Sequence, residues 1–220
     1  MIGMNEKLLQ QFLDSNVQKT LGKTINAKPE EISKLTEIAI PTLLAGLGRN
    51  SSTDEGARLL LDALTQHEDK DVSNLEKALK SVDKEDGSKI IGHIFGSETE
   101  KIQSNLAKES GLAANQVSDI LNQLAPLLMG ALGQEKKAGK LDSSSLSKIL
   151  LSLVGSGSSS GVLDIVIDLF TGGSDNALTD LVGNLLGGKK DSKKTTKKPI
   201  KKATKKDSGD LLDTFLKLLK

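Results

Sequence analysis

The sequence predicts an all-α fold, and three observations lead to it. Apolar residues recur every three or four positions along most of the 220 residues, and no stretch alternates with a period of two over the length of a strand. The chain has no tryptophan, no tyrosine and only four phenylalanines, so its core must be built from smaller aliphatic side chains. Residues 17–48 also align without a gap with residues 102–133, which indicates an internal repeat.

The repeat divides the chain into two units of about 90 residues, 1–96 and 97–188. Eight of the 32 aligned pairs are identical, including one proline and one glycine near the end of the alignment. Further on, IIGHIFG (90–96) matches LVGNLLG (181–187), but at a larger offset, which places an insertion in the Ser/Gly stretch 155–161. We therefore expect two tandem helical bundles, which can also pack together as one domain.

The first unit should contain five helices, and local signals mark their ends. Pro29 suits the first turn of the second helix, where its missing N–H costs nothing, and Glu30 and Glu31 favour a helix N-terminus. A run of serine, threonine and aspartate offers a cap for the third helix, and Gly48 and Gly96 are expected stops. The expected helices lie near 5–24, 29–47, 53–66, 72–82 and 87–95.

The second unit should repeat this order. Ser143 to Ser145 offer a cap for its third helix, and Gly133 and Gly187 are expected stops. The expected helices lie near 98–110, 114–132, 142–153, 161–170 and 177–187.

Pro41 and Pro126 lie about twelve residues into the second helix of each unit. A proline there removes one backbone hydrogen bond, so we expect each helix to be kinked or split. The small residues that follow allow another backbone to approach closely. We interpret these helices as the buried centre of each unit, with four leucines in the core: Leu43, Leu47, Leu128 and Leu132.

Two segments resemble a known family. IFGSETEKIQSNLAKESGLAANQVSDILNQLAPLLMGALG (94–133) and IPTLLAGLGRNSSTDEGARLLLDALTQHED (40–69) are similar to segments of the YidB-like bacterial family, a domain of unknown function. The resemblance covers about residues 5–153. It implies an all-α bundle and supplies no catalytic or binding residue.

Composition excludes several classes of function. The absence of cysteine excludes disulfides, thiolate metal sites and cysteine catalysis, and it fits a reducing compartment. No basic region followed by a long apolar run marks a signal peptide. The longest apolar candidate, 161–170, is about half the length that a bilayer requires and carries two aspartates. We expect a cytoplasmic protein with no transmembrane segment.

Catalytic and DNA-reading patterns are weak. GSSSG (157–161) matches a serine-nucleophile motif only formally, because no strand precedes it. His67 and His93 lack the spacing of metal ligands. The turn at Gly111 has the spacing of a helix-turn-helix, but the helix after it begins without the lysines and arginines that phosphate contact requires. We expect no enzymatic activity, no cofactor and no metal.

A strongly basic segment follows the two units. Residues 189–206 hold ten lysines and one aspartate, whereas residues 1–188 carry a net charge of −7. Repulsion between the lysines and the scarcity of apolar residues predict a disordered linker. Its candidate polyanion-binding residues are Lys193, Lys194, Lys197, Lys198, Lys201 and Lys202.

Residues 207–220 end in LLDTFLKLLK, whose apolar side chains form one stripe on a helix. So short a helix is marginal alone and needs a surface to cover the stripe. That surface is the body of the chain, a second copy, another protein or a membrane headgroup layer. The candidate partner-binding residues are Leu211, Leu212, Phe215, Leu216 and Leu219.

Together these features favour a non-catalytic helical scaffold or interaction protein. We expect it to form homo-oligomers or to bind a protein partner through the C-terminal amphipathic helix. The alternative is a nucleic-acid-associated protein that binds weakly and without sequence preference through the lysine-rich segment.

Overall fold

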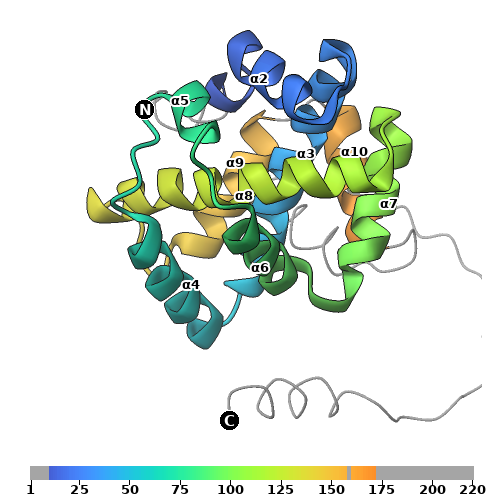
Figure 1. Ribbon diagram of the computed structural model, residues 1–220. Helices are drawn as coiled ribbons and strands as arrows, with labels where there is room; N and C mark the ends of the chain where they lie inside the picture. The colour runs from blue at the N-terminus through green and yellow to red at the C-terminus, as the bar shows by residue number, and fades with distance from the viewer. Residues whose placement is uncertain (1–9, 158–159, 172–220) are drawn as a thin grey trace, which may run out of the picture. The chain divides into compact units, whose positions relative to one another are not determined.

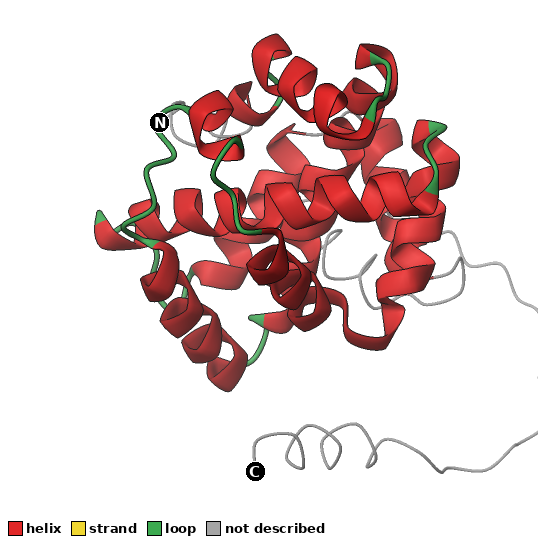
Figure 2. Ribbon diagram, in the orientation of Figure 1, coloured by secondary structure: helices red, strands yellow, loops and turns green. Residues whose placement is uncertain are grey.

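The computed structural model describes residues 10–157 and 160–171, and within them every regular element is helical (Figure 2). The all-α prediction is therefore confirmed. The predicted helix at 177–187, the basic linker and the C-terminal helix lie outside the described residues. The elements are α2 (Ser15–Ile25), α3 (Pro29–Asn50), α4 (Asp54–His67), α5 (Leu75–Leu79), α6 (Lys84–Phe95), the 3₁₀ turn η1 (Gly96–Glu98), α7 (Thr99–Ser110), α8 (Ala114–Lys137), α9 (Leu146–Gly157) and α10 (Ser160–Thr171).

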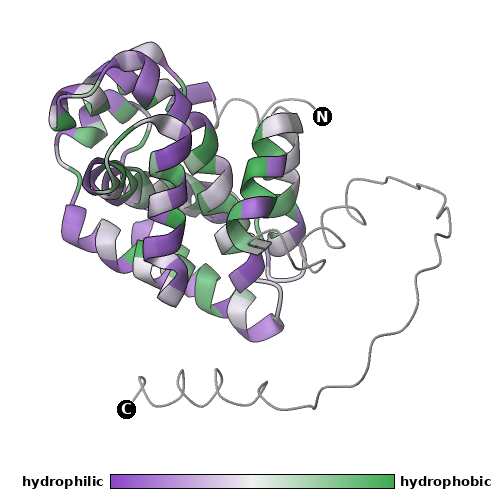
Figure 3. Ribbon diagram, turned by 90° about the vertical axis from the view of Figure 1, so that its right-hand side faces the viewer, coloured by the Kyte–Doolittle hydropathy of each residue, from purple (hydrophilic) through white to green (hydrophobic). Residues whose placement is uncertain are grey.

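The two long helices, α3 and α8, carry most of the core. Every residue of 38–48 in α3 and of 123–133 in α8 is buried, whereas the shorter helices bury only one face. Figure 1 shows α8 running across the middle of the bundle, with α4 and α6 on one side and α2 on the other. In Figure 3 most helices carry both hydrophobic and hydrophilic turns, as amphipathic helices around a common core do. The predicted core positions Leu43, Leu47, Leu128 and Leu132 are all at most 4% exposed.

Each long helix is covered mainly by helices from the other half of the chain, where the two halves are residues 1–96 and 97–188. The most extensive contact of α3 is with α9, and α7 and α10 also pack on it. The most extensive contacts of α8 are with α6 and α4. A hydrogen bond from Ser147 Oγ to the carbonyl of Gly48, 3.1 Å long, joins α9 to α3. Neither half therefore encloses its own central helix.

Both prolines lie inside continuous helices, so neither α3 nor α8 is split at its proline. Pro126 has no N–H to donate to the carbonyl of Asn122, one turn earlier. Gly87 of α6 lies against that carbonyl, since a Cβ on Gly87 would stand only 1.8 Å from the oxygen of Asn122. The proline thus leaves free a carbonyl on which a neighbouring backbone packs directly.

The expected glycine stops at Gly48 and Gly133 are also wrong, because α3 ends at Asn50 and α8 at Lys137. Both glycines instead lie at close contacts between helices. A Cβ on Gly133 would stand 2.7 Å from the carbonyl oxygen of Leu64 in α4, and one on Gly48 would stand 3.1 Å from the side chain of Leu151 in α9. These positions require glycine because a side chain would collide with the neighbouring helix, and not because the backbone turns there.

Two predicted helices of the first unit are shorter in the structure. The helix expected at 5–24 is interrupted before Ser15, because Asp14 Oδ1 accepts the N–H of Asn16 and caps α2. The helix expected at 72–82 is reduced to α5, since Asn74 caps it and Asp71 holds a turn through the N–H and hydroxyl of Ser73. Asparagine and aspartate here compete with the helix for backbone hydrogen bonds.

Candidate functional site

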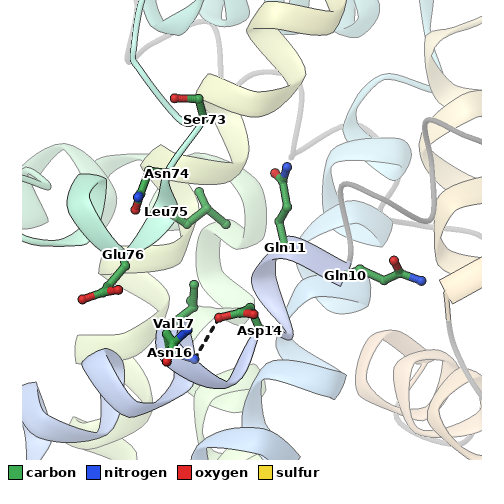
Figure 4. Close-up of a pocket in the computed structure, with 9 residues that line it drawn as sticks. All are labelled: Gln10, Gln11, Asp14, Asn16, Val17, Ser73, Asn74, Leu75 and Glu76. Carbon is green, nitrogen blue, oxygen red and sulfur yellow. Dashed lines mark hydrogen bonds between the residues drawn. The ribbon is translucent and has the colours of Figure 1, made fainter.

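A shallow pocket of about 410 Å³ lies between the beginning of α2 and the beginning of α5. Figure 4 shows side chains from both segments around it, with the carboxylate of Asp14 beside α2 and that of Glu76 on α5. Its floor is apolar and its rim is polar. The lining residues are Gln10, Gln11, Asp14, Asn16, Val17, Ser73, Asn74, Leu75 and Glu76.

Helix capping fixes two side chains of this rim, and the packing of α2 against α5 brings them together. Asp14 Oδ1 accepts the N–H of Asn16 at 2.8 Å, and Asn74 Oδ1 accepts the N–H of Lys77 at 2.9 Å. Both side chains are thereby fixed at the first turn of a helix. The floor consists of Val17 and Leu75, which are 4% and 5% exposed and belong to the common core.

The chemistry of the pocket is that of a hydrogen-bonding surface. Its rim carries amides and two carboxylates, Asp14 and Glu76, so it suits a neutral or cationic polar ligand better than an anionic one. Ser73 is engaged with Asp71, and its hydrogen bonds hold the pKa of Asp71 below the ordinary value. The pocket therefore pairs no serine with a base in the manner of a nucleophilic enzyme.

A second polar cluster lies at the end of α4. His67 is buried, and its Nδ1 stands 3.8 Å from Oδ2 of Asp86 in α6, too far for a hydrogen bond. Lys70 Nζ is 2.9 Å from the same carboxylate oxygen. Burial lowers the pKa of His67 from its ordinary value of 6.5; the charge of Lys70 lowers it further, and Asp86 opposes both.

We expect this histidine to make stability depend on pH. Below about pH 6.5 the unfolded chain takes up a proton at His67 that the folded chain resists. The free energy of unfolding should therefore fall as the pH decreases, by at most about 1.4 kcal/mol per pH unit. Above about pH 6.5 the contribution of His67 to the free energy of unfolding does not change with pH. Urea unfolding of the wild type and of His67→Gln between pH 5 and 8 measures the difference, and equal slopes would contradict the assignment.

The sequence-based site residues fall in different places. Both candidate sets, Lys193 to Lys202 and Leu211 to Leu219, lie outside the described residues. His93 is exposed on α6, whereas His67 is buried, so the two histidines do not meet. Sequence reasoning missed the pocket because its two walls are about 60 residues apart; the capping residues Asp14 and Asn74 were the available signal.

The described residues also lack a metal-binding cluster and a membrane-spanning helix. Among residues 10–157 and 160–171, histidine, aspartate and glutamate nowhere gather in a group of three that could hold a metal ion. In the same part of the chain, no helix combines the length and hydrophobicity needed to cross a membrane.

A family model, described as a bacterial protein of unknown function (DUF937), matches residues 6–135. This match covers α2 to α7, nearly all of α8 and more than half of the 220 residues. No curated protein and no solved structure matches the chain. The resemblance carried by 40–69 and 94–133 is thereby confirmed, and the chain belongs to the DUF937 family of bacterial proteins.

Proposed function

We propose that this chain is a non-catalytic helical interaction protein, cytoplasmic, whose partner contact is made by residues 207–220. The observation that carries the proposal is the apolar stripe of LLDTFLKLLK. Residues 10–157 and 160–171 support it, because Leu59, at 43%, is the one large hydrophobic residue among them that is exposed. Because these residues bury nearly all of their large apolar side chains, they offer little apolar surface to a partner, and we assign the contact to the C-terminal stripe.

The body itself we infer to be a duplicated unit. Local devices recur at equivalent positions: a left-handed residue ends α2 at Asn26 and α7 at Gly111. In addition, the backbone N–H before each long helix, at Lys28 and Ala113, donates to the side chain three residues on, at 3.0 Å in both cases. An experimental structure in which residues 17–48 and 102–133 follow different paths would contradict the duplication.

We expect a charge on the stripe to abolish partner binding and self-association. Phe215→Asp places a carboxylate among the leucines, where burial without a partner is costly. Asp213→Asn changes a residue that lies outside the predicted stripe and is the matched control. Light scattering across a concentration series, together with affinity capture on the full chain, measures both effects. Equal behaviour of the two variants would argue against the proposal.

The lysine-rich segment favours a second function, non-specific binding of a polyanion. Its net charge of +9 should release counterions from nucleic acid, so affinity for DNA should fall steeply with salt and show no sequence preference. Deleting 189–220 should abolish this binding, whereas deleting 207–220 should leave it nearly intact. Titration of a labelled DNA duplex at several salt concentrations tests this proposal. Binding that persists unchanged at high salt would exclude non-specific electrostatic binding by the lysine-rich segment.

A further inference from the structure

One residue makes the bend between α6 and α7. Phe95, Glu98 and Thr99 all have right-handed helical or near-helical backbone angles, for example φ −51° and ψ −51° at Thr99. Gly96 departs from them, with φ 55° and ψ −128°. That combination is open to glycine and strained for any other residue. A change at Gly96 is therefore the main adjustment needed to join α6, η1 and α7 into one helix.

The end of α3 holds this bend closed. Asn50 Nδ2 donates to the carbonyls of His93 and Ile94, each at 3.1 Å. In a continuous helix those carbonyls would accept the N–H groups four residues on, so Asn50 replaces the bonds that continuation would supply. Arg49 adds an ion pair with Glu98 of η1 at 2.7 Å.

The bend also separates two interlocked halves. The helices before it, α4 and α6, cover α8, and the helices after it, α9 and α10, cover α3. If the bend opened, α4 and α6 would no longer pack on α8 of the same chain, and α9 and α10 would no longer pack on its α3. A second copy of the chain offers the same surfaces in the same order, so every contact except the bend can be rebuilt between two chains.

We propose that this chain forms a dimer by exchanging halves with a second copy of itself. In this dimer α6 and α7 join through residues 96–98, and α3 and α8 of one copy are covered by helices of the other. The sequence allows the joined helix, since no proline occurs between Pro41 and Pro126. Gly96 and Asn50 favour the closed monomer. The exchange uses no residue of 189–220 and thus goes beyond the function proposed above.

Two matched alanine variants test the role of Gly96. Gly96→Ala introduces a residue strained in the bend and favourable in the joined helix, whereas Gly92→Ala lies in regular α6. A Cβ meets nothing within 4 Å at either position. Because two bent monomers lose two strained bends when one dimer forms, Gly96→Ala should raise the dimerisation constant about 30-fold or more, and Gly92→Ala should leave it nearly unchanged. Size-exclusion chromatography with light scattering, after refolding at high protein concentration, measures the constant.

Cross-linking distinguishes an exchanged dimer from a surface dimer. Lys137 of α8 lies 2.6 Å from Asp69, which follows α4, so a carbodiimide can join them without a spacer. Chains labelled with ¹⁴N and ¹⁵N are mixed before refolding, and the dimer fraction is cross-linked and digested. Exchange predicts Asp69–Lys137 cross-links of mixed isotope, whereas contact through 207–220 predicts links within one isotope only.

Two results would overturn the proposal: dimers whose Asp69–Lys137 links never mix isotopes, or equal dimerisation of Gly96→Ala and Gly92→Ala. Asn50→Ala provides an independent variant if Gly96→Ala does not refold. It removes the hydrogen bonds to His93 and Ile94, so it should also raise the dimerisation constant. Failure of both variants to increase the mixed-isotope dimer would refute the model.

Discussion

Replacing Gly87 by alanine should lower the free energy of unfolding by about 3 kcal/mol, near the upper end of the usual cost of overpacking. A Cβ at this position would stand 1.8 Å from the carbonyl oxygen of Asn122 and 2.6 Å from its carbon. These are backbone atoms of a buried helix and cannot turn aside as the end of a side chain can. We therefore expect α6 to move away from α8 over the length of their contact.

Gly92→Ala is the control, because it adds the same methyl group to the same helix. Apart from the backbone of α6 itself, no atom lies within 4 Å of a Cβ there, and the backbone is regular. It should leave stability unchanged or raise it by up to about 1 kcal/mol, since alanine is the better helix former. Urea unfolding followed by far-ultraviolet circular dichroism measures both variants. A cost at Gly87 no larger than that at Gly92 would refute the close contact of α6 with Asn122.

Leu128→Ala should cost about 2–5 kcal/mol, the range for a cavity left by a buried leucine. Leu128 is 1% exposed and lies in the stretch of α8 that is buried on all sides. The matched control is Leu59→Ala on α4, where the side chain is 43% exposed and the change should remain within about 0.5 kcal/mol. Thermal or urea unfolding that barely separates the two variants would contradict the placement of Leu128 in the core.

The fold class and most of the helices could be predicted because periodic apolar residues and capping residues are local signals. Pro29 and the glutamates after it marked the beginning of α3 correctly. Gly48 and Gly133 misled, because a glycine that ends a helix and a glycine that admits a neighbouring helix look alike in one sequence. Only the positions of Leu151 and Leu64 distinguish the two meanings, and these are tertiary.

The pocket shows the same limit more strongly. Asp14 and Asn74 were recognisable as residues that favour caps, but nothing local indicates that the two caps face one space. The cluster of His67, Lys70 and Asp86 likewise depends on α6 folding back beside the end of α4. Adjacency of this kind follows from the packing of whole helices and has no pattern of its own.

The interlocking of the two halves has a consequence during synthesis on the ribosome. The apolar surface of α3 is complete at Asn50, but α9, its principal cover, begins only at Leu146. At about 5–20 residues per second, that surface waits roughly 5–20 s for its partner. A nascent chain with so long an interval between a buried helix and its cover should be a regular client of ribosome-associated chaperones. Selective capture of nascent chains stalled before and after α9 would show this, with chaperone occupancy high before α9 emerges and low afterwards.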